Sequence, residues 1–167
     1  MIDRETRALA GELGAALREA GWLCATAESC TGGLLAGAMT ACPGSSLWFE
    51  RGFVTYSNAA KIQQLQVLPD TLDRHGAVSE ETAMEMAAGV LAATPAARLG
   101  LATTGIAGPG GATPGKPVGM VCFGIAHRAG EGISTRALTR VFDGDRDAVR
   151  QAAVRFALQA GLDALRR

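Results

Sequence analysis

The sequence predicts an α/β domain, a three-layer α/β/α sandwich built around a mixed central sheet. Three observations lead to this prediction. Helical patterns alternate with apolar strand-like segments, two late strands are joined by the turn sequence RAGEG, and no repeat or linker interrupts residues 1–167. The alternation favours parallel strands and the turn favours an antiparallel hairpin. We therefore expect one domain with a partly parallel sheet.

The first half of the chain supplies the first three helices and two strands. Apolar residues recur at helical spacing after Asp3, and Gly21 ends that helix. Pro43 and Gly44 end the second helix, and Asn58 is the expected N-cap of the third. The expected helices are 3–20, 33–42 and one that begins at 58, and the expected strands are 22–28 and 48–57.

The second half supplies a helix, three strands and a final helix. Ser79 is followed by two glutamates, which suit the positive end of a helix dipole, and this helix runs to Pro95. An apolar, buried-looking strand leads into a long loop rich in glycine and proline. The expected strands are 98–108, 118–127 and 133–142, the loop is 105–117, and the last helix opens at 143–147 and continues to 167.

Composition excludes several classes of protein. Hydrophobic residues make up 48% of the chain, charged residues 19%, and the formal net charge is zero, which is typical of a globular protein without a basic field for nucleic acid. No apolar run is long enough to span a membrane and no signal peptide is evident, so we expect a cytoplasmic location. The four cysteines form no CxxC pair, and neither a metal site nor a disulfide framework is indicated.

Three polar loops are expected at one edge of the sheet. Ligands of open α/β folds collect beyond the carboxyl ends of the strands. The loops at 29–33, 56–61 and 103–111 each follow a predicted strand. We therefore expect the binding site where these loops meet.

The stretch TAESCTGG, residues 26–33, is the first candidate site. Gly32 and Gly33 allow a ligand to approach the backbone, and the amides at the start of the following helix could bind an anion or an oxyanion. The alternative is structural, with Thr31 capping the helix and the glycines allowing tight packing. The sequence leaves both interpretations open.

A serine nucleophile in this stretch would need a base. There is no GxSxG motif, and the two histidines, His75 and His127, are expected in a loop and at a strand end, where surface or capping roles are typical. Lysine can act as the base instead. Tyr56 and Lys61 could converge on Ser29 across neighbouring strands, and burial would lower the lysine pKa.

Lysine and tyrosine are rare in this chain. Lys61 and Lys116 are the only lysines among sixteen basic residues, and Tyr56 is the only tyrosine. A chain so biased toward arginine has little general use for lysine, which suggests a site that needs an ionisable amine. Cys30 is the rival nucleophile, in a Glu28, lysine and cysteine combination, but we favour Ser29.

The glycine-rich loop has weaker motifs. GGATPGKP, residues 110–117, nearly satisfies the phosphate-loop pattern, but it lacks the final Ser or Thr and precedes a strand, so we reject nucleoside triphosphate hydrolysis. TTGIAGPGG, residues 103–111, contains no ordered GxGxxG. A surface loop and a flap over a ligand are both consistent with this segment.

Five blocks together resemble the CinA C-terminal domain family. They are TAESCTGG, GSSLWFERGFVTYSNAAK, HGAVSEETA, TGIAGPGG with KPVGMVCFG, and GDRDAVRQAAV, and they run in family order from about residue 5 to residue 165. The resemblance implies an α/β/α amidohydrolase domain over residues 1–167. It further implies hydrolysis of the carboxamide of nicotinamide mononucleotide to nicotinic acid mononucleotide and ammonia, in pyridine nucleotide recycling. Longer members carry an N-terminal pyrophosphatase-like domain, whose activity is not expected here.

The resemblance also implies site residues and partners. The family's serine, tyrosine and lysine fall on Ser29, Tyr56 and Lys61. We expect Ser29 to attack the amide while Lys61 takes its proton directly or through Tyr56, with no cofactor or metal and with a homodimer or larger homo-oligomer as the assembly. The expected substrate-binding residues are Cys30, Thr31, Gly32, Gly33, Ser45, Ser46, Thr104, Gly105, Ala107, Gly108 and Arg146.

Two other functions stay open from the sequence. The domain could bind a nucleotide as a regulatory module without turnover, because a fold does not guarantee chemistry. It could also hydrolyse another small amide. Ammonia release from nicotinamide mononucleotide separates the first alternative, and a panel of amide substrates separates the second.

Overall fold

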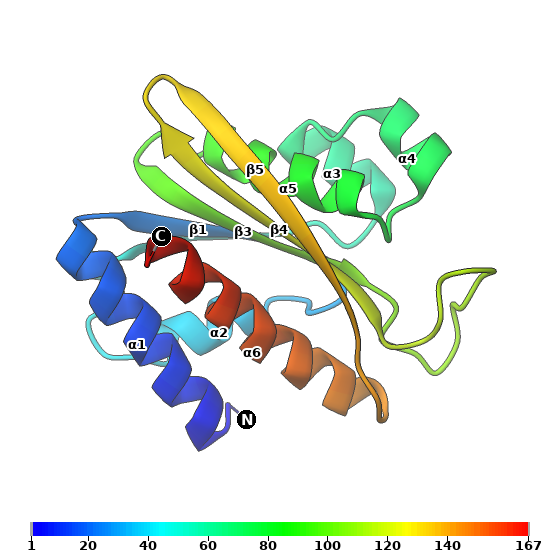
Figure 1. The fold of residues 1–167 in the computed structure, drawn as a ribbon, viewed down its shortest axis with the longest axis horizontal. Coiled ribbons are helices and arrows are strands. Elements are labelled where there is room, and N and C mark those ends of the chain that lie inside the picture. Colours follow the sequence, from blue (N-terminus) through cyan, green and yellow to red (C-terminus); the bar gives the residue numbers. More distant parts are fainter. Residues whose placement is uncertain (1, 167) are drawn as a thin grey trace.

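A computed structural model of the chain describes residues 2–166 and has a five-stranded sheet between two layers of helices (Figure 1). The elements in chain order are α1 (Arg4–Ala20), β1 (Leu23–Glu28), α2 (Leu34–Thr40), the 3₁₀ helix η1 (Ser45–Leu47), β2 (Phe49–Val54), α3 (Asn58–Leu65), α4 (Pro69–His75), α5 (Glu80–Ala92), β3 (Ala97–Gly105), β4 (Met120–Ala129), β5 (Gly132–Val141) and α6 (Arg146–Leu165).

The sheet is mixed, as predicted. Its strand order is β2-β1-β3-β4-β5. β1 runs parallel to both β2 and β3, whereas β4 pairs antiparallel with β3 and with β5. The carboxyl ends of the three parallel strands therefore lie at one edge, and that edge carries the three polar loops.

Helices cover both faces of the sheet and enclose two apolar cores. Helices α1, α2 and α6 pack on one face, and α3, α4 and α5 lie on the other (Figure 1). Strand β3 is buried along most of its length, which explains its near-continuous apolar sequence. The predicted three-layer sandwich is confirmed.

Helix α5 lies unusually close to the sheet. A Cβ atom at Gly124 of β4 would come within 1.9 Å of the Ala83 carbonyl oxygen of α5. Only glycine fits at that contact. The glycine thus sets the depth of the layer that carries α3 and Lys61.

Local sequence signals explain most element boundaries. Asp3 caps α1 by accepting a hydrogen bond from the Thr6 amide at 2.7 Å, and Gly21 ends the helix with a φ of 67°. Ser57, not Asn58, caps α3, because its hydroxyl accepts from the Ala60 amide. Helix α4, which includes His75, occupies a segment where the sequence had indicated only a loop.

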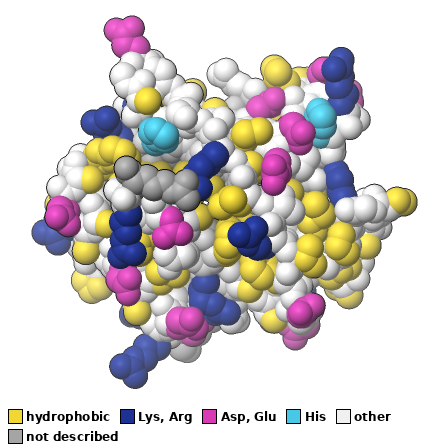
Figure 2. All heavy atoms as spheres, viewed as in Figure 1, with side chains coloured by type: hydrophobic (Ala, Val, Ile, Leu, Met, Phe, Trp, Pro, Cys, Tyr) yellow, Lys and Arg dark blue, Asp and Glu magenta, His cyan; other side chains and the backbone are white. Residues whose placement is uncertain are grey.

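The surface carries charges of both signs. Figure 2 shows acidic and basic side chains interspersed over the face seen in Figure 1, without a broad field of one sign. Within residues 2–166, no helix combines the length and apolar character needed to cross a bilayer.

Candidate active site

A cavity of about 260 Å³ lies at the carboxyl ends of β1, β2 and β3, and we call it the Ser29 cavity. Its lining residues are Ser29, Cys30, Tyr56, Lys61, Ala77, Val78, Thr104, Gly105, Ile106, Ala107, Gly108, Gly110, Gly111 and Arg146. The three loops that sequence reasoning placed at this edge do meet here. Two lining residues, Lys61 and Arg146, are basic and none is acidic, so the cavity suits an anionic ligand.

Lys61 contacts Ser29 directly. The Nζ of Lys61 lies 3.0 Å from Ser29 Oγ, 2.9 Å from the Thr55 carbonyl oxygen and 3.4 Å from the Tyr56 carbonyl oxygen. Ser29 follows β1, and Lys61 lies in the first turn of α3, which follows β2. The Lys61 side chain extends back to the Thr55 carbonyl, directly after β2. Adjacent parallel strands therefore bring the two groups together.

Burial perturbs the Lys61 amine. The residue is only 1% exposed, and within residues 2–166 no carboxylate forms an ion pair with it. Loss of hydration penalises the charged form, so the pKa of Lys61 is lowered from its usual value. The structure thus supplies the desolvation that a lysine base requires.

Cys30 is poorly placed as a nucleophile. Burial raises the pKa of its thiol to about 12, so the reactive thiolate is scarce at neutral pH. Glu28 is fully buried, and its carboxylate binds the Thr31 hydroxyl and the first amides of α2, not Lys61. The alternative Glu28, lysine and cysteine combination is therefore not assembled.

Glu28 occupies the start of α2. Its carboxylate accepts hydrogen bonds from the Thr31 hydroxyl at 2.7 Å and from three backbone amides, those of Gly33, Leu35 and Ala36, at 3.2, 2.8 and 3.0 Å. These amides had been expected to bind an anion or an oxyanion. That expectation is wrong, because the protein's own carboxylate already fills the position; the suggested cap by Thr31 is wrong for the same reason.

The turn from Ser29 to Gly33, here called the Ser29 turn, keeps two amides free. The Ser29 amide donates to the Thr103 carbonyl at 2.9 Å and the Gly32 amide donates to the Ser29 carbonyl at 3.0 Å. Among the described residues, none accepts a hydrogen bond from the amide of Cys30 or Thr31. Cys30 lines the Ser29 cavity, so its amide is the candidate oxyanion donor.

Tyr56 and Arg146 form a bridge at the Ser29 cavity. The Tyr56 hydroxyl accepts a hydrogen bond from Arg146 Nη2 at 2.9 Å, and Arg146 Nη1 donates to the Gly108 carbonyl at 2.8 Å. Arg146 is the first residue of α6, and Tyr56 is 60% exposed. The tyrosine hydroxyl is thus engaged by Arg146, and a relay through it is not needed for contact between Lys61 and Ser29.

Several expected binding residues have other positions or partners. Ser45 and Ser46 lie in η1, at the amino end of β2, and do not line the Ser29 cavity. The structure therefore does not place them where substrate-binding residues were expected. The Thr104 hydroxyl lines the cavity but donates to the Ala77 carbonyl at 2.7 Å, so its proton is not free for a phosphate. Lys116 contacts the His75 carbonyl instead of the cavity.

The backbone of residues 105–111 forms one wall of the cavity. Gly105, Ala107 and Gly108 line it as expected. Thr31, Gly32 and Gly33 lie in the Ser29 turn but do not line the cavity, so their contribution is to the shape of the turn. Neither histidine lines the cavity, in agreement with the roles expected for them.

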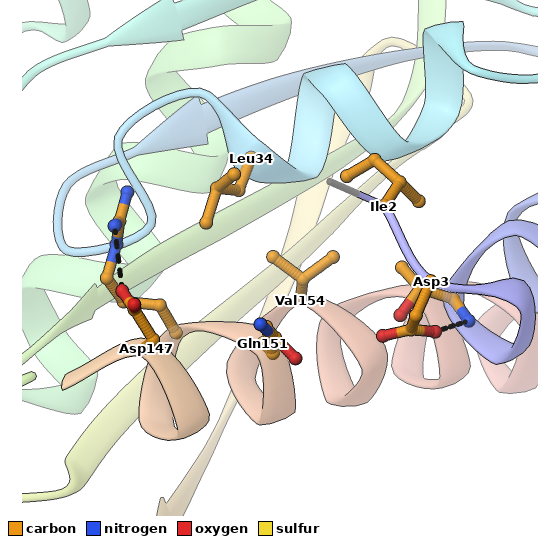
Figure 3. Close-up of a pocket in the computed structure, with 8 residues that line it drawn as sticks. Ile2, Asp3, Leu34, Asp147, Gln151 and Val154 are labelled. Atoms are coloured by element: carbon orange, nitrogen blue, oxygen red, sulfur yellow. Dashed lines mark hydrogen bonds and ion pairs between the residues drawn. The ribbon is translucent and has the colours of Figure 1, made fainter. Parts of the chain in front are cut away.

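A second cavity of about 220 Å³ lies behind the Ser29 turn, between α1, α2 and α6 (Figure 3). Leu34 and Val154 face it, and Asp3 and Asp147 lie at its ends (Figure 3). It contains none of the predicted site residues. Within residues 2–166, no group of three His, Cys, Asp or Glu side chains could hold a metal ion.

Sequence reasoning missed Glu28 as the anchor of α2 and Arg150 as a partner of the turn. Arg150 of α6 donates to the carbonyl oxygens of Cys30 and Thr31. A glutamate directly before a turn and two glycines was a readable signal for the first. No pattern in the sequence joins residue 150 to residue 30.

Known proteins closely resemble this chain. A sequence model of the CinA C-terminal domain matches residues 6–165. The nicotinamide-nucleotide amidohydrolase PncC of Escherichia coli (strain K12) is 51% identical over 159 residues, which are 95% of this chain and 94% of that protein. The protein of the same name from Enterobacter agglomerans is 49% identical over 162 residues, covering 97% of this chain and 96% of that one. The crystal structure of competence damage-inducible protein A from Klebsiella pneumoniae superposes with a TM-score of 0.91 at 40% identity, covering 97% of this chain and 98% of that one.

Proposed function

Because the chain belongs to the CinA C-terminal domain family, we propose that it is an amidohydrolase that converts nicotinamide mononucleotide to nicotinic acid mononucleotide and ammonia in pyridine nucleotide recycling. The observation that carries the proposal is the 3.0 Å contact between the buried Lys61 amine and the Ser29 hydroxyl. A nucleophile and its base must lie within hydrogen-bond reach of one another. This pair meets that condition at a cavity able to hold a small molecule.

Lys61 acts as the base because its surroundings favour the neutral amine. A neutral amine has two N–H groups and one lone pair. The Thr55 and Tyr56 carbonyls accept the two N–H groups, which leaves the lone pair directed at Ser29 Oγ. The two carbonyls therefore orient the base, and Tyr56 contributes through its backbone.

Ser29 attacks the carboxamide carbon as Lys61 takes the hydroxyl proton. The developing oxyanion accepts a hydrogen bond from the Cys30 amide. When the tetrahedral intermediate collapses, the C–N bond breaks and the Lys61 ammonium returns the proton to the leaving nitrogen, which departs as ammonia. Water then attacks the acyl-enzyme with Lys61 again as base, and the acid and free Ser29 are released.

The positive charge of Arg146 and the absence of acids from the lining of the Ser29 cavity favour a mononucleotide, which carries one phosphate. Arg146 and the backbone amides of Ala107, Gly108, Gly110 and Gly111 are the phosphate donors that we propose, since the phosphate can replace Tyr56 or Gly108 as the partner of the guanidinium. The pyridinium cation of the substrate lies near Lys61 and favours the neutral amine further. Substrate charge thus assists the chemistry.

The test is ammonia release from nicotinamide mononucleotide by the purified chain in the presence of a chelator. We expect Ser29→Ala to abolish release and Cys30→Ala to retain it. The opposite pattern would refute the serine assignment. Binding of the mononucleotide without ammonia, at high enzyme concentration, would refute the amidase and favour a regulatory module.

Residues 1–167 as one domain, the cytoplasmic location and the homo-oligomeric state remain predictions of this proposal. Light scattering coupled to size-exclusion chromatography measures the assembly. A monomer at assay concentration would contradict the oligomer.

A further inference from the structure

We propose that Arg150 is a positioning residue for the amidase reaction, which holds the Ser29 turn in the conformation that presents its free amides. This inference rests on the proposed function and adds a residue that does not line the Ser29 cavity. Arg150 acts on the turn through its backbone, from the side of α6.

The guanidinium makes two separate contacts with consecutive carbonyls of the turn. Its Nε donates to the Cys30 carbonyl at 3.2 Å and its Nη2 donates to the Thr31 carbonyl at 3.2 Å. Among residues 2–166, the guanidinium forms one ion pair, a long one of 3.9 Å from Nη1 to Asp147, which leaves Nε and Nη2 for the two carbonyls. A planar fork of donors suits this paired geometry, and a lysine ammonium would not reproduce it.

The peptide geometry converts these contacts into control of the amides. In a trans peptide the carbonyl and the N–H point in opposite directions. Holding the Cys30 carbonyl toward α6 therefore directs the Thr31 amide away from α6. The bond from the Gly32 amide to the Ser29 carbonyl fixes the Cys30 amide in the same way.

The turn needs such a restraint because of its glycines. Gly32 and Gly33 have φ values of 58° and 94°, and glycine has several accessible conformations where other residues have few. Glu28 accepts hydrogen bonds from the Gly33 amide at the end of the turn and from the amides of Leu35 and Ala36 beyond it. Arg150 donates to the Cys30 and Thr31 carbonyl oxygens within the turn. The carboxylate thus restrains N–H groups and the guanidinium restrains C=O groups.

Packing does not explain the position of Arg150. Arg150 lines the second cavity, together with Leu34 and Val154. A shorter or apolar side chain at this position extends an existing space. We therefore expect the substituted chain to fold, with the effect concentrated in the turn.

The experiment compares Arg150→Met and Arg150→Lys with Arg155→Met. Arg155 lies on the same helix, has a similar exposure (31% against 26%), and pairs with Asp3 and Glu5 far from the turn, which makes it a matched control. For Arg150→Met we expect kcat to fall about 10- to 100-fold with KM changed less than about threefold, because the turn and not the substrate site is loosened. Arg150→Lys should lie between, and Arg155→Met should match the unsubstituted chain.

Hydrogen–deuterium exchange of the unliganded protein provides a readout that does not depend on activity. Peptides that cover residues 23–37 should exchange faster in Arg150→Met and remain unchanged in Arg155→Met. If exchange in this segment and kcat both match the unsubstituted chain, or if KM rises in place of the fall in kcat, the inference is overturned. If the unsubstituted chain itself releases no ammonia, the proposed function fails, and the exchange data alone decide the role of Arg150.

Discussion

Replacing Glu28 with glutamine tests whether this carboxylate holds the start of α2. Oε1 of Glu28 accepts three hydrogen bonds, from Thr31, Gly33 and Leu35, and Oε2 accepts one, from the Ala36 amide. A glutamine carbonyl can take over the first three. Its NH₂ group then faces the Ala36 amide, donor against donor, at a site that is fully buried.

The magnitude follows from these contacts. One hydrogen bond to a charged group is worth about 1.5–3 kcal/mol, and a charge at a helix N-terminus contributes up to about 2 kcal/mol when partly buried. Glu28→Gln should therefore lower the free energy of unfolding by about 2–5 kcal/mol. With a urea slope of about 2 kcal/mol per molar, the midpoint falls by about 1–2.5 M.

Urea unfolding followed by circular dichroism at pH 7 measures this difference. The matched control is Glu12→Gln, at an exposed glutamate of α1, which should change stability by less than about 0.5 kcal/mol. A Glu28→Gln chain as stable as the control would refute the claim that the carboxylate anchors α2. The Ser29 turn would then require another explanation for its geometry.

Three further predictions concern the site and the packing beneath it. Because burial lowers the pKa of Lys61 and the neutral amine is the active form, kcat/KM should rise with pH through a pKa below the usual lysine value, and a profile flat from pH 5 to 9 would contradict this. Tyr56→Phe removes the hydroxyl that accepts from Arg146 and should raise KM about 3- to 10-fold with little change in kcat, whereas a 100-fold loss of kcat would establish a proton relay. Gly124→Ala forces a methyl group against α5 and should lower the free energy of unfolding by about 1–3 kcal/mol or more. Gly37→Ala, where a Cβ meets nothing within 4 Å, should not lower it. Equal melting temperatures for the two variants would show that α5 can move away.

The fold was readable because its local signals agree with its topology. Capping residues mark the starts of α1 and α5, glycine ends α1, and the turn after β4 requires an antiparallel partner. The carboxyl ends of parallel strands lie at the same edge of the sheet, so the sequence predicted that Ser29 and Lys61 lie close together. Helix α4 escaped because seven residues are too few for a clear helical pattern.

The parts of the site that escaped depend on where side chains point. Ser45 and Ser46 are an exception, because they precede β2, and their position at its amino end was readable from the predicted strand 48–57. The amides at the start of α2 have the sequence pattern of an anion site, but they already donate hydrogen bonds to Glu28. Whether this helix terminus is free depends on the rotamer of Glu28, and the sequence signal of a glutamate before the turn does not fix that rotamer.

The bridge from Tyr56 through Arg146 to Gly108 is made by three segments that leave the ribosome at different times. The proposed catalytic pair, Ser29 and Lys61, is synthesised early, yet the guanidinium that joins Tyr56 to Gly108 belongs to the last helix. We therefore expect chains that are truncated or cleaved before α6 to be unable to deamidate nicotinamide mononucleotide.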